Sequence, residues 1–165
     1  MLTPYLPYPL TSGGQTRSYN LLKFLSQKHE ITLFSLIKDD EEKKYINKLT
    51  PYCKNIRVFN RSKSPWTLRN ILLALFSWYP FLVVRNLARD QKKAIAEELK
   101  SNHYDLIHAE TFYVMPHIPP TSVPVLLVEQ TIEYLVYKHY VEEQAPFLAK
   151  FLFWLDVVKL RYWET

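Results

Sequence analysis

The sequence predicts an α/β fold, in which a Rossmann-like parallel sheet carries helices on both of its faces. Short β-branched and apolar segments alternate along the chain with longer segments of helical periodicity. Strands that alternate with helices form right-handed βαβ crossovers, and these crossovers build parallel sheets. The best-defined strand, residues 30–37, also shows little alternation between apolar and polar side chains, as a strand buried on both faces should.

The first elements follow one another closely. Residues 1–3 predict only the last rung of a first strand. A full strand needs more apolar residues than this segment has. A helix over residues 15–28 follows, with apolar side chains at helical spacing. After the strand at 30–37, the charged residues 38–48 are compatible with a solvated helix, and residues 55–59 predict a third strand.

The rest of the chain alternates in the same way. The predicted elements are an apolar helix at 66–78 that is broken near Pro80, a helix at about 86–101, buried strands at 105–109 and 123–129 with a loop or short helix at 110–122 between them, and a last helix at 146–165. The last helix has no glycine, asparagine or proline stop signal at its end. We therefore expect residues 1–165 to be one amino-terminal domain of a longer protein.

Composition narrows the function classes. With 165 residues, of which 48% are hydrophobic and 22% charged, the chain suits one folded domain. Its net charge of +5 suits anionic lipid, nucleotide phosphate and nucleic acid about equally, but the basic residues are too scattered to favour nucleic acid. Cys53 is the single cysteine, which excludes an intrachain disulfide. No Cys or His pairing has zinc spacing, so no metal is expected.

The sequence predicts a cytoplasmic location. It has no signal-peptide pattern, and its longest mostly apolar run, residues 71–84, is too short to span a bilayer. All four tryptophans lie in or beside basic amphipathic segments: Trp66, Trp78, Trp154 and Trp163. Such segments suit an anionic membrane surface, which would place the protein peripherally at the inner membrane face. Packing into a core or against a further domain explains them equally well.

The only two glycines, Gly13 and Gly14, are adjacent and lie between a short apolar start and the first helix. Glycine lets a backbone come close to a ligand, and the start of a helix presents free N–H groups and a positive dipole end. Arg17 opposes that dipole, so it is useful there only where something negative approaches. The pattern indicates an anion site, and a plain turn into the helix is an equally good interpretation. The spacing matches neither the dinucleotide-binding nor the P-loop pattern.

Two more candidate sites follow predicted strands, where ligands bind in open α/β sheets. His108 and Glu110 close the fourth strand, and Gln130 and Glu133 follow the fifth. A histidine can take a proton from a hydroxyl group, and carboxylates can orient sugar hydroxyls. Each of these residues alone is better explained as structural. What favours a binding site is that the glycine pair and the ends of the fourth and fifth strands should all lie at one edge of one sheet. No Ser-His-Asp order or H-E-x-x-H pair supports hydrolase chemistry.

The segments around the glycine pair and the fourth strand share a pattern with a known family. The residues concerned are Pro7-Tyr8-Pro9, Ser12-Gly13-Gly14, Arg17, Tyr19-Asn20-Leu21-Leu22, Leu25, His29-Glu30-Ile31-Thr32-Leu33 and Asp105-Leu106-Ile107-His108-Ala109-Glu110. Together they resemble the amino-terminal domain of GT-B glycosyltransferases of the large retaining family 4. More weakly, the likeness extends through residues 124–133 and 159–164.

The resemblance implies two Rossmann-like domains that face each other across a cleft, with this chain as the first half, on the acceptor side. It implies that Gly13, Gly14 and Arg17 contact the diphosphate of a nucleotide-sugar donor. It also implies that His108 is catalytic and lies near the acceptor and the transferred sugar. No cofactor beyond the nucleotide sugar, and no metal, is implied. Without the carboxyl-terminal, donor-binding domain, the chain is expected to be inactive.

The acceptor side follows from the same resemblance. Glu110, Gln130 and Glu133 would bind a glycan or a lipid-linked acceptor. Relatives often carry His-Asn where this chain has Gln130-Thr131, and the family's donor motif of two glutamates separated by seven residues does not occur. The alternative from another class is a non-catalytic Rossmann-like domain that binds an anionic ligand or a protein partner.

Overall fold

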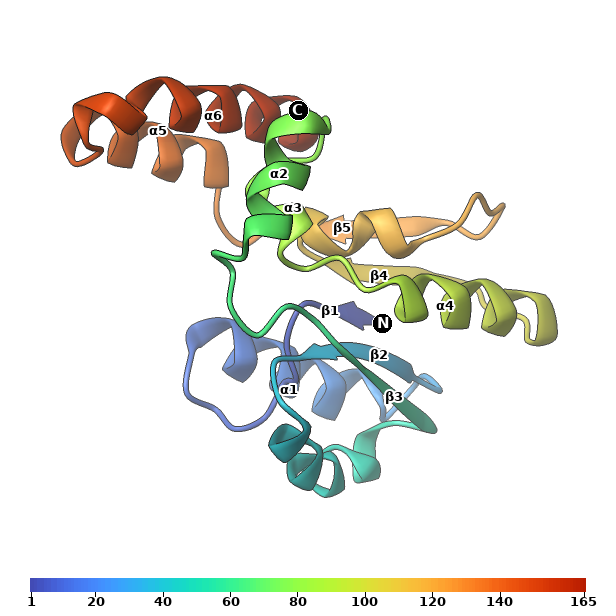
Figure 1. The fold of residues 1–165 in the computed structure, drawn as a ribbon. Coiled ribbons are helices and arrows are strands. Elements are labelled where there is room, and N and C mark those ends of the chain that lie inside the picture. The colour runs from blue at the N-terminus through green and yellow to red at the C-terminus, as the bar shows by residue number, and fades with distance from the viewer.

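The computed structural model describes residues 1–165, apart from the side chain of Leu148, and it confirms the predicted α/β fold. Five strands form one parallel sheet in the order β3-β2-β1-β4-β5 (Figure 1). The strands are β1 (Leu2–Thr3), β2 (Thr32–Ile37), β3 (Asn55–Asn60), β4 (Ile107–Glu110) and β5 (Val125–Val128).

Helices connect the strands and cover the sheet. The α-helices are α1 (Gly13–Leu25), α2 (Leu68–Phe76), α3 (Phe81–Val84), α4 (Arg89–Ser101), α5 (Glu133–Glu143) and α6 (Lys150–Glu164). The 3-10 helices are η1 (Asp40–Lys48), η2 (Thr50–Tyr52), η3 (Phe112–His117) and η4 (Phe147–Ala149).

The centre of the sheet is the short strand β1. Leu2 pairs with Phe34 of β2 on one side and with Ala109 of β4 on the other. From β1 the chain adds β2 and β3 in one direction, and it returns to add β4 and β5 in the other. The order therefore reverses between β1 and β4, and in open α/β sheets the crevice at the carboxyl ends of such a strand pair is where ligands bind.

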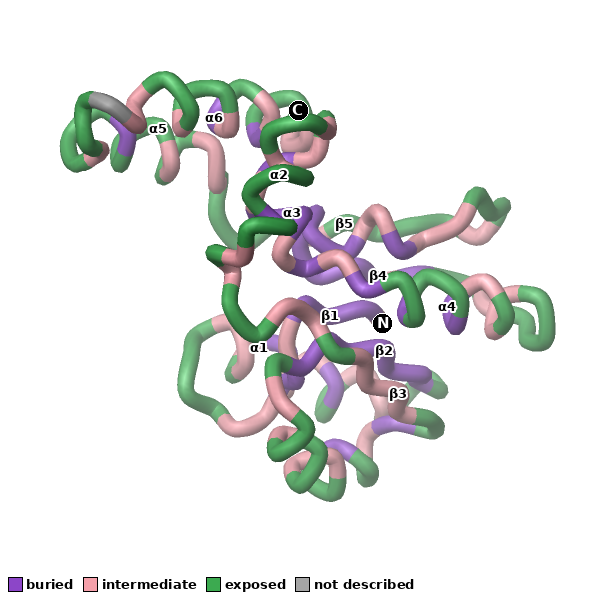
Figure 2. The backbone as a smooth tube through the Cα atoms, in the orientation of Figure 1, coloured by how far each residue is buried: buried purple, intermediate pink, exposed green. Residues whose placement is uncertain are grey.

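Each face of the sheet has its own core. On one face, α4 and η3 pack against the sheet through Leu2, Phe34, Ala94, Ile95, Ile107, Ala109 and Val114. On the other face, α1 and the segment that contains η1 and η2 pack through Leu6, Leu22, Ile31, Leu33, Ile37, Leu49 and Cys53. Figure 2 shows that burial is concentrated on β1, β2, β4 and α3, whereas α2 and much of α5 and α6 are exposed.

A third cluster attaches the carboxyl-terminal helices to the rest of the molecule. It joins α3, η3 and α6 through Leu82, Val83, Phe112, Tyr113 and Leu160. In Figure 1, α5 and α6 lie side by side beyond the sheet, next to α2. The two last helices therefore extend the helical layer around α3.

Strand β5 differs from its prediction, because it is not buried. Val125, Leu126 and Leu127 are 38%, 44% and 39% exposed. The strand lies at the edge of the sheet, and the helices that follow it, α5 and α6, pack in the cluster around α3 instead of on β5. An apolar run alone cannot distinguish a central strand from an edge strand of this kind.

Two helical segments also differ from expectation. Residues 40–48 form a 3-10 helix with a capping box, in which Asp39 Oδ1 accepts from the Glu41 N–H at 3.3 Å and Glu42 Oε1 accepts from the Asp39 N–H at 3.3 Å. Helix α5 was not predicted, since its tyrosines, valines and histidine have low helix propensity. Its first turn is capped from α6, where the Glu164 carboxylate accepts from two backbone N–H groups at 2.7 and 2.8 Å.

Candidate functional site

The most densely connected polar group at the switch point is the Glu110 carboxylate, at the end of β4. Its side chain is fully buried. Glu110 Oε2 forms an ion pair with Arg17 Nη1 of α1 and accepts from Gln130 Nε2 at 3.0 Å. Glu110 Oε1 lies 2.7 Å from His108 Nε2. Three of the segments singled out in the sequence thus meet at one carboxylate.

These partners decide the charge of Glu110. Burial raises its pKa, but the hydrogen bonds from His108 and Arg17 and the charge of Arg17 outweigh burial, so that this pKa lies below its usual value. Glu110 is therefore ionised at neutral pH. The ionised Glu110 carboxylate can therefore hold Arg17 in place through the ion pair. A guanidinium has five N–H donors, and the ion pair occupies only part of them.

The start of α1 lies beside this carboxylate. Ser12 caps the helix, with its Oγ accepting from the Gln15 N–H at 3.3 Å. Neither glycine has a positive φ, and both belong to the first helical turn. A Cβ built on Gly13 meets no atom within 4 Å, whereas one built on Gly14 would overlap with Tyr5 Oη and lie 3.3 Å from Gln130 Oε1. Gly13 faces open space, and Gly14 makes room for the Tyr5 ring.

We expect substitution by alanine to change the free energy of unfolding in opposite directions at the two glycines. Gly13→Ala should raise the free energy of unfolding by up to about 1 kcal/mol, because alanine loses less backbone entropy in a helix and its methyl group meets nothing. Gly14→Ala should lower it by up to about 1 kcal/mol, because moving the Tyr5 ring costs more than the same gain in backbone entropy returns. Urea unfolding of the two variants measures the difference, and each variant is the matched control of the other. Equal stabilisation by both changes would contradict the packing of Tyr5 against Gly14.

Glu133 lies apart from the Glu110 carboxylate. Its Oε1 accepts from the Tyr113 hydroxyl at 2.5 Å. Nearby, Glu129 Oε1 accepts from the Phe112 N–H at 2.6 Å. Partial burial of the Glu129 carboxyl, with the charges of neighbouring glutamates, raises its pKa to about 7. The structure thus divides the sequence-predicted acidic residues into a buried group around Glu110 and a second group at the start of α5.

Thr111 is a residue of this site that sequence reasoning missed. It follows Glu110 directly and has a φ of 70°, which is rare for a β-branched residue and strained. Its Oγ1 is buried, without a hydrogen-bond partner among the described residues. Its N–H donates to Val128 O at 2.9 Å, which ties the turn to β5. Positive φ values signal themselves in a sequence mainly through glycine or asparagine, so nothing in the residues around Thr111 indicated one.

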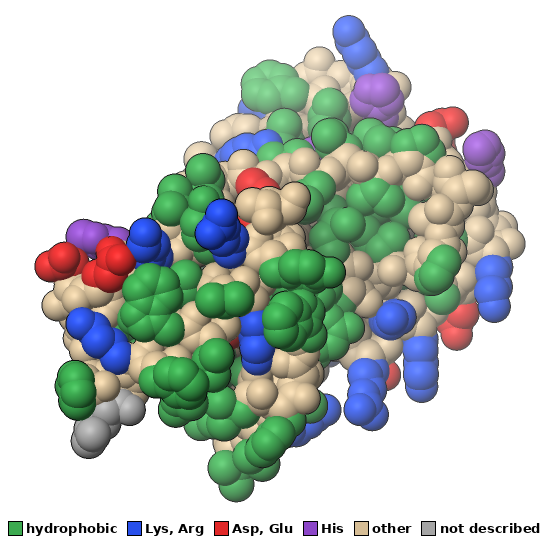
Figure 3. Space-filling view, turned by 90° about the horizontal axis from the view of Figure 1, so that it is seen from above, with side chains coloured by type: hydrophobic (Ala, Val, Ile, Leu, Met, Phe, Trp, Pro, Cys, Tyr) green, Lys and Arg blue, Asp and Glu red, His purple; other side chains and the backbone are tan. Residues whose placement is uncertain are grey.

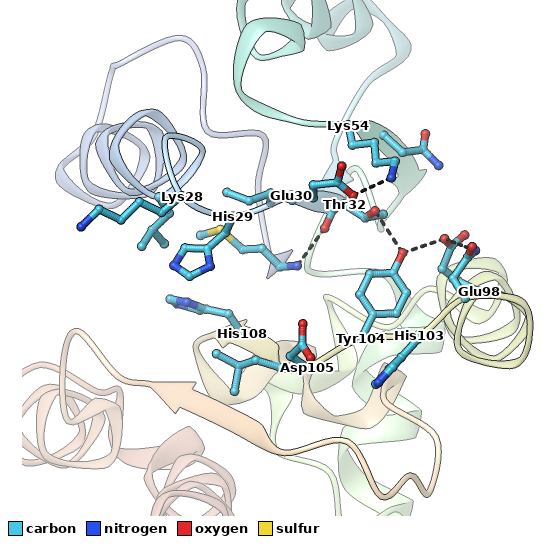
Figure 4. A pocket seen from close by; sticks show the side chains of 16 residues that line it. Lys28, His29, Glu30, Thr32, Lys54, Glu98, His103, Tyr104, Asp105 and His108 are labelled. Atoms are coloured by element: carbon cyan, nitrogen blue, oxygen red, sulfur yellow. Dashed lines mark hydrogen bonds and ion pairs between the residues drawn. The ribbon is translucent and has the colours of Figure 1, made fainter.

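His108 also faces a cavity at the opposite end of the sheet (Figure 4). This cavity of about 740 Å³ is lined by the segments that precede β2, β3 and β4, including Lys28, His29, Lys54 and His103. At this end of the sheet β1 is recessed relative to β2. Strand β2 begins at Thr32, whereas the first residue of β1, Leu2, pairs with Phe34. The structure thus places His108 inside β4, between this cavity and Glu110, and not at the carboxyl edge itself.

Many polar groups around this cavity are already engaged. The Tyr104 hydroxyl donates to Glu98 Oε1 at 2.7 Å and accepts from the Thr32 hydroxyl at 3.0 Å, and Lys54 pairs with Glu30 at 2.5 Å. His117, the last residue of η3, is buried, and both of its ring nitrogens bond to the backbone. Among the described side chains no group of three or more His, Cys, Asp or Glu residues could hold a metal ion.

Comparisons of the chain with protein-family models, with curated proteins and with solved structures give no match. The geometry of the site therefore carries the functional argument.

Proposed function

We propose that this chain is the acceptor-side domain of a nucleotide-sugar-dependent retaining glycosyltransferase of the GT-B type. The observation that supports this most is the meeting of Arg17, Gln130 and the buried Glu110 carboxylate at the carboxyl ends of β1 and β4. That is the position at which ligands bind in open α/β sheets. The resemblance of the glycine segment to family 4 glycosyltransferases points to the same edge.

In this proposal the diphosphate of the donor lies over the start of α1. The space above Gly13 is open, and the free N–H groups of a helix start attract anions. Arg17 is 37% exposed at its side chain, so it can contact Glu110 and a phosphate at the same time. A second, donor-binding domain would close over this edge.

The burial of Glu110, Gln130 and His108 distinguishes their roles on the acceptor side. Glu110 is fully enclosed by its partners, so we assign it to positioning Arg17 and not to binding sugar hydroxyls. Gln130 is exposed, and because its Nε2 group bonds to Glu110 and Tyr5, it offers its amide oxygen to a hydroxyl of a glycan or lipid-linked acceptor. His108 is held by Glu110, and as a base it would act only if the acceptor reached β4 from above the sheet.

The experiment is a titration of the chain with uridine diphosphate at millimolar concentration, followed by NMR of the backbone amides. Shifts should concentrate at Gly13, Gly14 and Arg17. Arg17→Lys should weaken binding about tenfold or more, because lysine keeps the charge but loses the forked contact to phosphate. Lys23→Arg, an exposed change at the other end of α1, is the matched control and should leave binding unchanged.

A second candidate function is a non-catalytic domain that binds a partner through its exposed apolar helices. The observation that favours it is the exposure of large apolar side chains along α2 and α6. The same titration separates the two candidates. Amide shifts that are absent from the start of α1, or that do not change in Arg17→Lys, would leave the enzyme proposal without its donor site.

A further inference from the structure

Helices α2 and α6 are joined into one unit by their own side chains. Lys159 Nζ donates to Ala74 O and, at 2.8 Å, to Ser77 O, so a lysine of α6 caps the end of α2. Trp163 Nε1 donates to Trp78 O at 3.2 Å. These contacts fix the outer surface of the two helices as a single surface.

That surface is apolar along both helices. We call it the apolar face, and it consists of Leu68, Leu72 and Phe76 on α2, Phe151, Leu155, Val158 and Tyr162 on α6, and Trp66 and Trp78 beside α2. The spacing within each helix is that of one helical stripe. Phe76 is 86% exposed and Phe151 is 71% exposed. Side chains of this size are rarely left in water in such numbers without a function.

The exposed charges that α2 and α6 themselves carry are of one sign, whereas α5 beside them has the exposed Glu142 and Glu143. Helix α2 contains no acidic residue, and both carboxylates of α6 are turned onto backbone N–H groups: Asp156 accepts from Phe81 at 2.8 Å, and Glu164 caps α5. Arg69 and Arg161, by contrast, are exposed. Figure 3, seen from the side of α5 and α6, shows hydrophobic side chains with Lys and Arg between them and Asp or Glu side chains at the margin.

We propose that the apolar face docks on the surface of an anionic lipid bilayer. Leucine and phenylalanine side chains would enter the headgroup and acyl boundary, while Arg69 and Arg161 contact lipid phosphates. Trp66 and Trp78 are 63% and 57% exposed, and tryptophan is enriched at membrane interfaces.

The composition of the apolar face favours a bilayer over a second copy of this chain. In a symmetric dimer the same cations would meet one another with no exposed carboxylate of α2 or α6 to offset them. Helix α6 has 15 residues, and in the part of the chain that the structure describes no helix is long and apolar enough to cross a membrane. The two helices would therefore lie in the plane of the interface.

The test is co-sedimentation of the chain with vesicles of phosphatidylcholine alone and of phosphatidylcholine with phosphatidylglycerol. We expect binding to the anionic vesicles at low salt, weakened by added salt. Phe76→Ser and Phe151→Ser should each weaken it about tenfold, because each removes a large apolar group from the interface. Arg69→Gln and Arg161→Gln should each weaken it about fivefold on anionic vesicles alone.

The matched control is Phe24→Ser, a substitution of a 62% exposed phenylalanine on α1 that should leave binding unchanged. Circular dichroism checks that the variants remain folded, as expected for such exposed positions. Three results would overturn the proposal: no sedimentation with anionic vesicles at low salt, equal binding to both lipid mixtures, or equal loss in Phe24→Ser. Self-association that Phe76→Ser abolishes, without vesicle binding, would assign the apolar face to a second copy instead.

Discussion

Arg17→Met will lower the free energy of unfolding by about 3 kcal/mol at neutral pH, because it leaves the buried Glu110 charge without its cation. Gln130 and His108 remain as partners, so the loss falls at the lower end of the range for broken buried pairs. Chemical denaturation of the purified chain measures it. The matched control is Lys54→Met, which breaks a pair with Glu30 in which both side chains are well exposed, and should cost at most about 1 kcal/mol.

The effect of Arg17→Met should depend on pH in a defined direction. The pKa of Glu110 is lowered in the native protein, so its contribution to stability is present above the usual value of 4.5 and is lost as the pH falls through the lowered value. The difference between wild type and Arg17→Met should therefore shrink in acid. Glu110→Gln in the Arg17→Met background should restore part of the loss, since it removes the isolated charge. A difference that stays constant from neutral to acid pH would show that Arg17 stabilises the fold through packing alone.

Acidification will destabilise the native protein through His117, which is 1% exposed. Its Nδ1–H group donates to Val114 O at 3.1 Å, and its Nε2 accepts from the Ala88 N–H at 2.9 Å at the start of α4. This arrangement requires the neutral ring. Burial lowers the pKa of His117 from 6.5 to about 4, with a smaller contribution from the charge of Lys92.

The sign and window of this effect follow from linkage. A lowered folded pKa means that the unfolded chain binds the proton more tightly, so stability is complete above pH 6.5 and is lost as the pH falls toward 4. The loss is on the order of 3 kcal/mol, at about 1.4 kcal/mol for each pKa unit. His117→Phe should be less stable at neutral pH, because the Ala88 N–H loses its acceptor, but it should lack this part of the pH dependence. Parallel curves of stability against pH for the two proteins would contradict a neutral, buried His117.

The strands and the first helix could be predicted because their signals are local. The β-branched run of β2 and the helical spacing of apolar residues in α1 act within a few residues, so the sequence alone was enough to locate both elements. It placed the start of the helix at residue 15, whereas the structure has Ser12 as the cap and both glycines inside α1. The convergence of the glycine segment, Glu110 and Gln130 on one edge followed from a general rule for parallel sheets.

Partner choice could not be predicted in the same way. Arg17 and Glu110 are 93 residues apart in the chain, and their pairing depends on β4 lying beside β1. The sequence predicted a ligand phosphate as the partner of Arg17, and the structure shows a buried carboxylate, that of Glu110, as a partner within the chain. The cap on α5 likewise comes from Glu164, which the residues of α5 do not reveal.

By itself, the sequence determined the alternation of strands and helices and the location of the polar residues near the ends of strands, because periodicity is a property of neighbouring residues. Only the tertiary structure decided that β5 is an exposed edge, that His108 lies inside its strand, that Thr111 has a positive φ and that α2 and α6 share one apolar face. Each of these depends on strand order, register or contacts between distant segments, and the energies of such contacts are not encoded in any one stretch of the chain.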